Sequence, residues 1–147
     1  MKMSSLVLMI GVLLVAADNP KDDKKAKTDL DKFQGSWLGV EITYNGDQAS
    51  KEGAEKVKFT IKGDKWTVEQ PDGIELQGTL KLDEKKKPKE LDATTDDGKT
   101  ILGIYEVDGD KLKLCYAEPG GERAKEFSSK AGSGHTLAVY KRARRQP

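Results

Sequence analysis

The sequence has one cysteine and one histidine among 147 residues, and this scarcity excludes several classes of protein. Cys115 has no partner for an intramolecular disulfide, so the chain is not a disulfide-stapled scaffold and must draw its stability from a hydrophobic core. His135 has no second histidine with which to share a zinc ion or a proton. The sequence therefore predicts no catalytic residue, no metal site and no cofactor, and it does not favour an enzyme.

Extended apolar runs are also lacking, except at the N-terminus. Leu6 to Ala17 is a run of 12 residues, whereas a helix that spans a bilayer needs roughly 20. Lys2 precedes this run, which ends in the small residues that a signal peptidase requires. We predict a signal peptide over residues 1–17, cleaved before Asp18, and a protein exported to the periplasm or the extracellular space. An uncleaved membrane anchor is the alternative, and it also implies export.

An excess of charge of one sign is missing as well. Lys and Arg number 26 and Asp and Glu number 25, and Lys2 is the only charged residue of the predicted signal peptide. A mature chain with balanced charge gives no reason to expect a nucleic acid as partner. Residues 18–28 are charged and apolar-free, which predicts a disordered spacer, and residues 143–147 form a basic tail after a single domain at 29–142.

What the domain does contain is short runs of alternating apolar and polar residues, separated by turn residues. Gly63-Asp64 and Pro71-Asp72-Gly73 are predicted hairpin turns, and the second of them pairs Trp66 with Gly78. About eight such strands joined mostly by short links predict an all-β fold, a single antiparallel up-and-down barrel. One helical turn at residues 29–33 is expected to precede the first strand.

The clearest hairpin signal lies in residues 100–117, where Asp108-Gly109 separates two alternating runs. A type I′ turn at this pair would set Val107 opposite Asp110. Because the register then follows along both strands, it predicts three further cross-strand pairs. They are Tyr105 with Leu112, Glu106 with Lys111, and Leu102 with Cys115. The last pair predicts an apolar, unreactive thiol.

The first strand, predicted over residues 35–44, does not alternate cleanly. Trp37 falls on the face opposite Val40 and Ile42, although all three are large and apolar. An extra residue at Gly39, in a β-bulge, would let Trp37 and Val40 point the same way. We therefore predict a bulge at this glycine.

Several residues resemble those of known families. Gly35 and Trp37 at the start of the first strand, with Arg142 near the end of the last, resemble the lipocalins and related up-and-down barrels, in which the tryptophan plugs the closed end and the arginine lies across it. The resemblance implies the same barrel-closing role for these three residues. A larger set is similar to the small lipocalin-like domain of unknown function found in planctomycete bacteria, which implies the fold and export but brings no activity. That set is Leu30–Trp37, Lys87–Asp92, Gly103–Tyr105 with Asp108–Asp110, Leu112–Tyr116, Arg123 with Glu126–Phe127, and Lys141–Arg142.

The interior of the predicted barrel is the main candidate binding site. Eight strands enclose a space that side chains just fill, or that holds one small ligand. A packed core is the alternative, because large residues outnumber the gaps at Gly78, Ala93 and Gly103. Besides Leu80, the residues predicted to line the lumen are Phe59, Trp66, Leu76, Gly78, Tyr105, Leu112, Leu114 and Tyr116.

Acidic residues offer weaker candidates. Asp96-Asp97 and Asp108-Gly109-Asp110 place carboxylates in tight turns, where calcium could bind. Aspartate and glycine are, however, also the residues that such turns require. Glu41, Glu69 and Glu75 would be the carboxylates of a glycoside hydrolase, but nothing in the sequence selects them.

These observations predict an exported, non-enzymatic β-barrel module that binds a small apolar or amphipathic molecule through its open end. Residues 45–55 and 118–134 would form the rim or lid. The alternative is a filled barrel with no small ligand, which recognises a protein or envelope partner through exposed loops. Leu102 and Ile104, predicted on the outer face of the central hairpin, are the apolar residues that favour this second hypothesis.

Overall fold

The computed structural model describes residues 28–143. The predicted signal peptide, the spacer up to residue 27 and the tail from residue 144 lie outside the described residues. Within residues 28–143 no helix is long and apolar enough to cross a bilayer. The helices are α2 (Asp29–Phe33) and α3 (Lys51–Glu55), and the strands are β1 (Gly35–Tyr44), β2 (Asp47–Gln48), β3 (Lys58–Lys62), β4 (Lys65–Glu69), β5 (Glu75–Asp83), β6 (Glu90–Thr95), β7 (Thr100–Asp108), β8 (Lys111–Ala117) and β9 (His135–Arg142).

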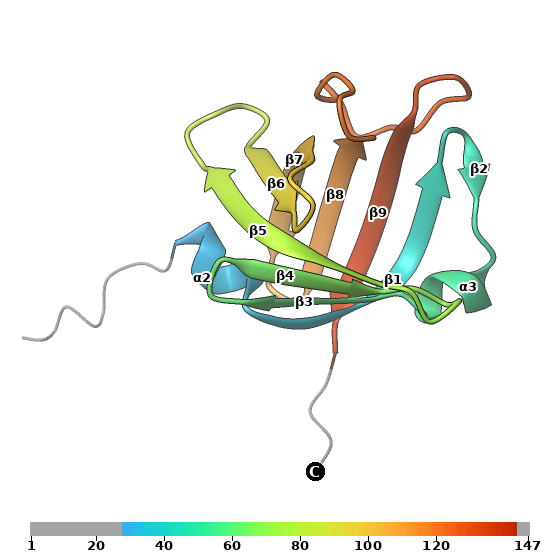
Figure 1. The fold of residues 1–147 in the computed structure, drawn as a ribbon, viewed down its shortest axis with the longest axis horizontal. Coiled ribbons are helices and arrows are strands. Elements are labelled where there is room, and N and C mark those ends of the chain that lie inside the picture. The colour runs from blue at the N-terminus through green and yellow to red at the C-terminus, as the bar shows by residue number, and fades with distance from the viewer. Residues whose placement is uncertain (1–27, 144–147) are drawn as a thin grey trace, which may run out of the picture.

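The strands form one antiparallel sheet that closes on itself. From β3 to β9 each strand pairs with the next one in the chain, and β1 pairs with both β3 and β9. The two-residue strand β2 only adds to the end of β1. Figure 1 shows the result, with α2 and α3 on opposite sides of the barrel. The prediction of an all-β, up-and-down barrel preceded by a helical turn is confirmed.

The predicted register of β3, β4 and β5 is confirmed as well. Trp66 lies opposite Gly78, as the three-residue loop between β4 and β5 requires. Gly73 in that loop has a φ of +88°, the left-handed conformation that glycine adopts without strain. These turns therefore set the pairing through their local conformation.

The register of the β7–β8 hairpin differs from the prediction by two residues. Asp108 pairs with Lys111, so the two-residue loop is Gly109-Asp110. Gly109 has a φ of +60° and stands first in the loop, which is the arrangement of a type II′ turn. A shift of two residues keeps every side chain on its predicted face. The corrected pairs are Val107 with Leu112, Tyr105 with Leu114, Glu106 with Lys113, and Ile104 with Cys115.

The predicted bulge in β1 is present, but it does not turn Val40 inward beside Trp37. The register against β9 shifts between Gly39 and Glu41, so Val40 is the extra, unpaired residue and its side chain is exposed. Ile42, not Val40, joins Trp37 in packing against the core. Gly39 leaves room for α3, because a Cβ atom there would lie 2.1 Å from the carbonyl oxygen of Ala54.

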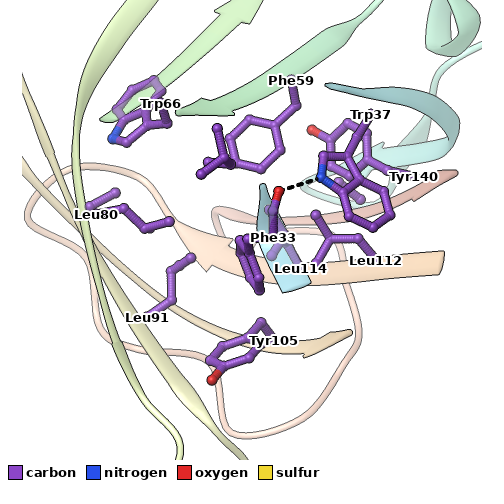
Figure 2. Close-up of a cluster of buried hydrophobic side chains, with 13 residues drawn as sticks. Phe33, Trp37, Phe59, Trp66, Leu80, Leu91, Tyr105, Leu112, Leu114 and Tyr140 are labelled. Atoms are coloured by element: carbon purple, nitrogen blue, oxygen red, sulfur yellow. Dashed lines mark hydrogen bonds between the residues drawn. The ribbon is translucent and has the colours of Figure 1, made fainter. Parts of the chain in front are cut away.

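The core runs along the inside of the barrel and is closed at one end by α2. Figure 2 shows the inward-pointing rings and aliphatic side chains, with Phe33 of α2 among them. The rings of Phe33 and Tyr105 meet edge to face, with centroids 5.2 Å apart. We call the end of the barrel that α2 closes the plugged end. The opposite end is bordered by the β4–β5 and β6–β7 turns, and it is less completely filled.

Candidate functional site

The barrel encloses a cavity of about 130 Å³ away from the plugged end. Its wall comes from seven strands, and its side chains are almost all apolar. Leu76 is 45% exposed, which places it at the mouth, and Gln70 follows the end of β4. The lining residues are Phe59, Trp66, Val68, Gln70, Leu76, Leu80, Leu91, Ala93, Ile101, Leu114, Tyr116 and Tyr140.

The residues predicted for the lumen divide between the cavity and the plugged end. Those that line the cavity are Phe59, Trp66, Leu76, Leu114 and Tyr116. Tyr105 and Leu112 point inward but are fully buried in the packed part of the core. Gly78 contributes no lining, because a Cβ atom there would lie 1.8 Å from the carbonyl oxygen of Thr94. Its role is to let β5 and β6 approach each other closely.

The polar groups of the cavity are few. The Trp66 indole donates to the carbonyl oxygen of Thr79 at 2.8 Å, so its N–H is satisfied within the wall. Burial raises the pKa of Tyr116, and a hydrogen bond with Thr136 partly opposes this. Tyr140 is 3% exposed and stacks on Phe59 with ring centroids 5.5 Å apart. No charged side chain lines the cavity. A charged group inside it would have no counter-charge, so the cavity favours uncharged molecules.

At the plugged end the structure brings Gly35, Trp37 and Arg142 together. The guanidinium carbon of Arg142 lies 4.2 Å from the centre of the Trp37 ring, a cation–π geometry. Its nitrogens also donate to the carbonyl oxygens of Gln34 at 2.7 Å and Lys32 at 2.9 Å. A Cβ atom on Gly35 would lie 3.3 Å from the same guanidinium. These contacts tie α2 to the end of β9 and keep this end shut.

A second polar cluster at the plugged end centres on Asp29, which is 1% exposed. Its Oδ2 accepts hydrogen bonds from the Lys89 ammonium and the Tyr105 hydroxyl, both at 2.8 Å. Burial alone would raise the pKa of Asp29, but these hydrogen bonds and the positive charges of Lys89 and Lys32 outweigh it and hold the pKa below 3.8. The charged carboxylate thus anchors α2 over the barrel.

The Asp29 cluster predicts a specific loss of stability in acid. Because folding lowers the pKa of this carboxyl group, its contribution is complete above the unfolded value of 3.8 and is lost as the pH falls through the lower folded value. Asp29→Asn is expected to cost about 2 kcal/mol at neutral pH. The difference between wild type and variant should narrow below pH 3.8, as measured by urea denaturation across the pH range.

Two lysines of the same loop serve as controls for this prediction. Lys89→Met should also reduce the dependence of the unfolding free energy on acid pH, because it removes the closer of the two cations that pair with Asp29. Lys86→Met should leave the dependence unchanged, because Lys86 is exposed and makes no ion pair among the described residues. A wild-type curve that stays parallel to that of Asp29→Asn down to pH 2 would contradict the assignment.

The long connection between β8 and β9, residues 118–134, does not close over the cavity. We call it the strap. Ala124 is buried and Phe127 partly buried against Ile104 and Cys115 on the outer face of β7 and β8. Neither the strap nor residues 45–55 contribute to the cavity lining, so of the predicted rim or lid these segments do not form the lid.

The strap is held at two places. Arg123 donates to the carbonyl oxygens of Leu91 at 3.0 Å and Gly103 at 2.9 Å, and its other nitrogen lies 2.7 Å from Asp92 Oδ1. Near the barrel end the strap meets the β1–β2 turn, where Gly134 donates to Asn45 Oδ1 at 2.8 Å. Two segments of the rim are therefore joined to each other beside the mouth.

The other candidates have structural explanations. Burial raises the pKa of Cys115, whose thiol donates to the carbonyl oxygen of Ser128. His135 Nε2 lies 3.2 Å from the carbonyl oxygen of Glu122. Asp97 accepts from Thr95, and Asp110 pairs with Arg142 at 3.2 Å, so one carboxylate in each of the two turns has a protein partner.

The carboxylates considered for hydrolysis do not converge on the cavity. Glu69 and Glu75 face each other across β4 and β5, exposed, and Glu41 lies opposite Val139 on another part of the wall. None of the three lines the cavity. In the part of the chain that the structure describes, no three His, Cys, Asp or Glu residues gather in a way that could hold a metal ion.

Sequence reasoning missed part of the cavity wall. Tyr140 stands two residues before Arg142, and the alternation of a strand places both on one face. Since Arg142 was expected to lie across Trp37, which was expected to plug the barrel, that spacing could have identified Tyr140. Val68, Leu91 and Ile101 also line the cavity.

Comparisons with protein-family models and with curated proteins found no match. A solved structure with a similar arrangement is the crystal structure of a lipocalin-like protein from Bacteroides uniformis ATCC 8492. The two chains are 12% identical, the match covers 76% of this chain and 99% of that one, and the TM-score is 0.49. The assignment of the fold rests on the strand pairing described above.

Proposed function

We propose that this protein is an exported, non-enzymatic β-barrel module that binds one small apolar or amphipathic molecule in its cavity. The observation that carries the proposal is the cavity itself, a space of about 130 Å³ with an apolar wall at the end of the barrel that α2 leaves open. An engineered apolar cavity of about 150 Å³ is known to bind benzene. Export is inferred from residues 1–17, and membership of the planctomycete-type lipocalin-like domains is inferred from the residue pattern.

Native mass spectrometry of the protein purified from its own host tests both parts of the proposal. The expected result is a polypeptide that begins at Asp18 and carries a small adduct lost on activation. A chain that retains residues 1–17 would argue against cleavage. A bare polypeptide mass, together with no binding of benzene to the purified protein, would overturn the binding function.

Filling the cavity is expected to abolish binding. Ala93 lines the cavity and is 8% exposed, so a leucine side chain there would occupy the space. Ala93→Leu should weaken benzene binding at least about tenfold, measured by calorimetry, because the leucine side chain would take up the volume that the ligand needs. Thr94→Leu is the matched control, since Thr94 is the next residue on β6 and is exposed. Equal binding by Ala93→Leu and the wild type would contradict the site.

The alternative, a filled barrel that docks partners through Leu102 and Ile104, loses one of its two residues, while Leu102 is partly exposed. Ile104 is 1% exposed and lies beneath the strap with Cys115 and Ala124, because residues 122–128 cover this part of the outer wall. The prediction that Ile104 is an exposed contact residue is wrong.

A further inference from the structure

The cavity contains a deeply buried polar group that makes no hydrogen bond among the described residues. Tyr140 is 3% exposed and lines the cavity, and among the described residues its hydroxyl makes no hydrogen bond. By contrast, the hydroxyl of the fully buried Tyr105 donates to Asp29. A buried hydroxyl is nearly always paired in a folded protein. Of the two tyrosines that are more than nine-tenths buried in the described residues, Tyr105 is therefore paired and Tyr140 is not.

The position of Tyr140 directs this hydroxyl toward the cavity. Its ring is fixed on one side by the stack on Phe59, and Leu112 lies across from it on β8. Figure 2 shows Phe59 and Tyr140 side by side, facing the interior. Burial, with a smaller contribution from nearby Tyr116, raises the pKa of Tyr140, so the hydroxyl stays protonated and can both donate and accept.

The size and charge of the site limit what can pair with this group. A volume of about 130 Å³ is well below the roughly 300 Å³ at which pockets for drug-sized ligands begin. No charged side chain lines the wall, so a buried ionic group would be uncompensated. At the mouth, the tip of the β4–β5 hairpin, residues 69–75, carries Glu69, Asp72 and Glu75 and no basic residue, which disfavours a carboxylate head group there.

We propose that the cavity selects a compact, uncharged molecule, about the size of one aromatic ring, that carries a hydroxyl or carbonyl group hydrogen-bonded to Tyr140. This inference rests on the proposed function and specifies its ligand class. Long-chain carboxylates are excluded by volume and by the acidic hairpin. The ring would occupy the apolar space beside Leu80, Leu91 and Leu114, and its polar group would complete the hydrogen bonding of the tyrosine.

Benzene and phenol form the matched probe pair, because they differ by one hydroxyl group. Binding is measured by titration of the methyl NMR signals of Leu80, Leu91 and Ile101, which all line the cavity. In Tyr140→Phe, phenol binding should weaken about tenfold relative to benzene, since the phenol hydroxyl loses its partner. Tyr116→Phe is the control, because Tyr116 also lines the cavity but is only partly buried, and the ratio of phenol to benzene affinity should change less than twofold.

Each outcome separates this inference from the function on which it rests. If wild type and both variants bind benzene and phenol in the same ratio, the role of Tyr140 is overturned while cavity binding stands. If hexadecanoate displaces benzene more effectively than phenol does, the compact ligand class is overturned. If neither probe shifts the cavity methyl signals of the wild type, the proposed function itself fails. Tyr140→Phe removes only an unpartnered hydroxyl, so its melting temperature should match or exceed that of the wild type.

Discussion

Trp37→Ala is expected to lower the free energy of unfolding by about 4 kcal/mol, since truncation of a buried aromatic side chain typically costs 3 to 5 kcal/mol. The Trp37 ring is fully buried, and its indole nitrogen donates to the carbonyl oxygen of Phe33 at 2.8 Å. The variant would leave a void, an unpaired carbonyl group and an Arg142 guanidinium without its ring. Urea denaturation followed by the fluorescence of Trp66 would measure the loss.

Two further variants define what the tryptophan contributes. Trp37→Phe keeps a ring beneath Arg142 but removes the hydrogen bond to Phe33, so about half of the loss is expected. Leu76→Ala, at a side chain that is 45% exposed, should cost less than about 1 kcal/mol. A loss below 1 kcal/mol for Trp37→Ala would show that α2 does not depend on this residue.

Arg123→Ala is expected to lower the free energy of unfolding by about 3 kcal/mol and to loosen the strap. Arg123 joins the strap to two backbone carbonyl oxygens and to Asp92, and its side chain is 23% exposed. Without it, the strap should detach more often from the outer wall and expose Cys115, which is otherwise fully buried. The thiol should then react with an aromatic disulfide reagent at least about tenfold faster than in the wild type.

Lys125→Ala provides the matched control for this prediction. Lys125 belongs to the same strap, is exposed, and makes no ion pair among residues 28–143. Its loss should leave both the stability and the reaction rate of Cys115 close to wild type. If Cys115 of Arg123→Ala reacts with the reagent at the wild-type rate in native buffer, the strap is held by Ala124 and Phe127 and not by the arginine.

Alternation and turn chemistry were sufficient for most of the fold. Each strand shows an apolar face, and short links restrict neighbours in sequence to neighbours in space. The β7–β8 register was wrong because Asp108-Gly109 and Gly109-Asp110 both make acceptable turns and keep the same faces. The observed turn, Gly109-Asp110, is stabilised by Arg142, whose side chain reaches the carboxylate of Asp110 from 32 residues away in the sequence. Such a contact has no signature in the local sequence.

The cavity was only partly predictable for a related reason. A period of two assigns a side chain to the inside or the outside of a barrel, but it does not give the side chain's height along the barrel axis. Tyr105 and Leu112 were assigned correctly to the inside and yet lie in the packed half. Their depth depends on α2, which inserts Phe33 beneath them. The polar anchor of that helix joins Asp29 to Lys89 and Tyr105, which are 60 and 76 residues away in the sequence.

The position of the two chain ends has a practical consequence. Thr28 precedes α2, and Ala143 follows Arg142 over Trp37, so the chain enters and leaves the barrel at its plugged end. A tag, a surface linker or a neighbouring domain joined directly at Thr28 or Ala143 would be attached on the side away from Leu76 and Gln70. Protein immobilised through either of these two residues should therefore present its cavity to the solution.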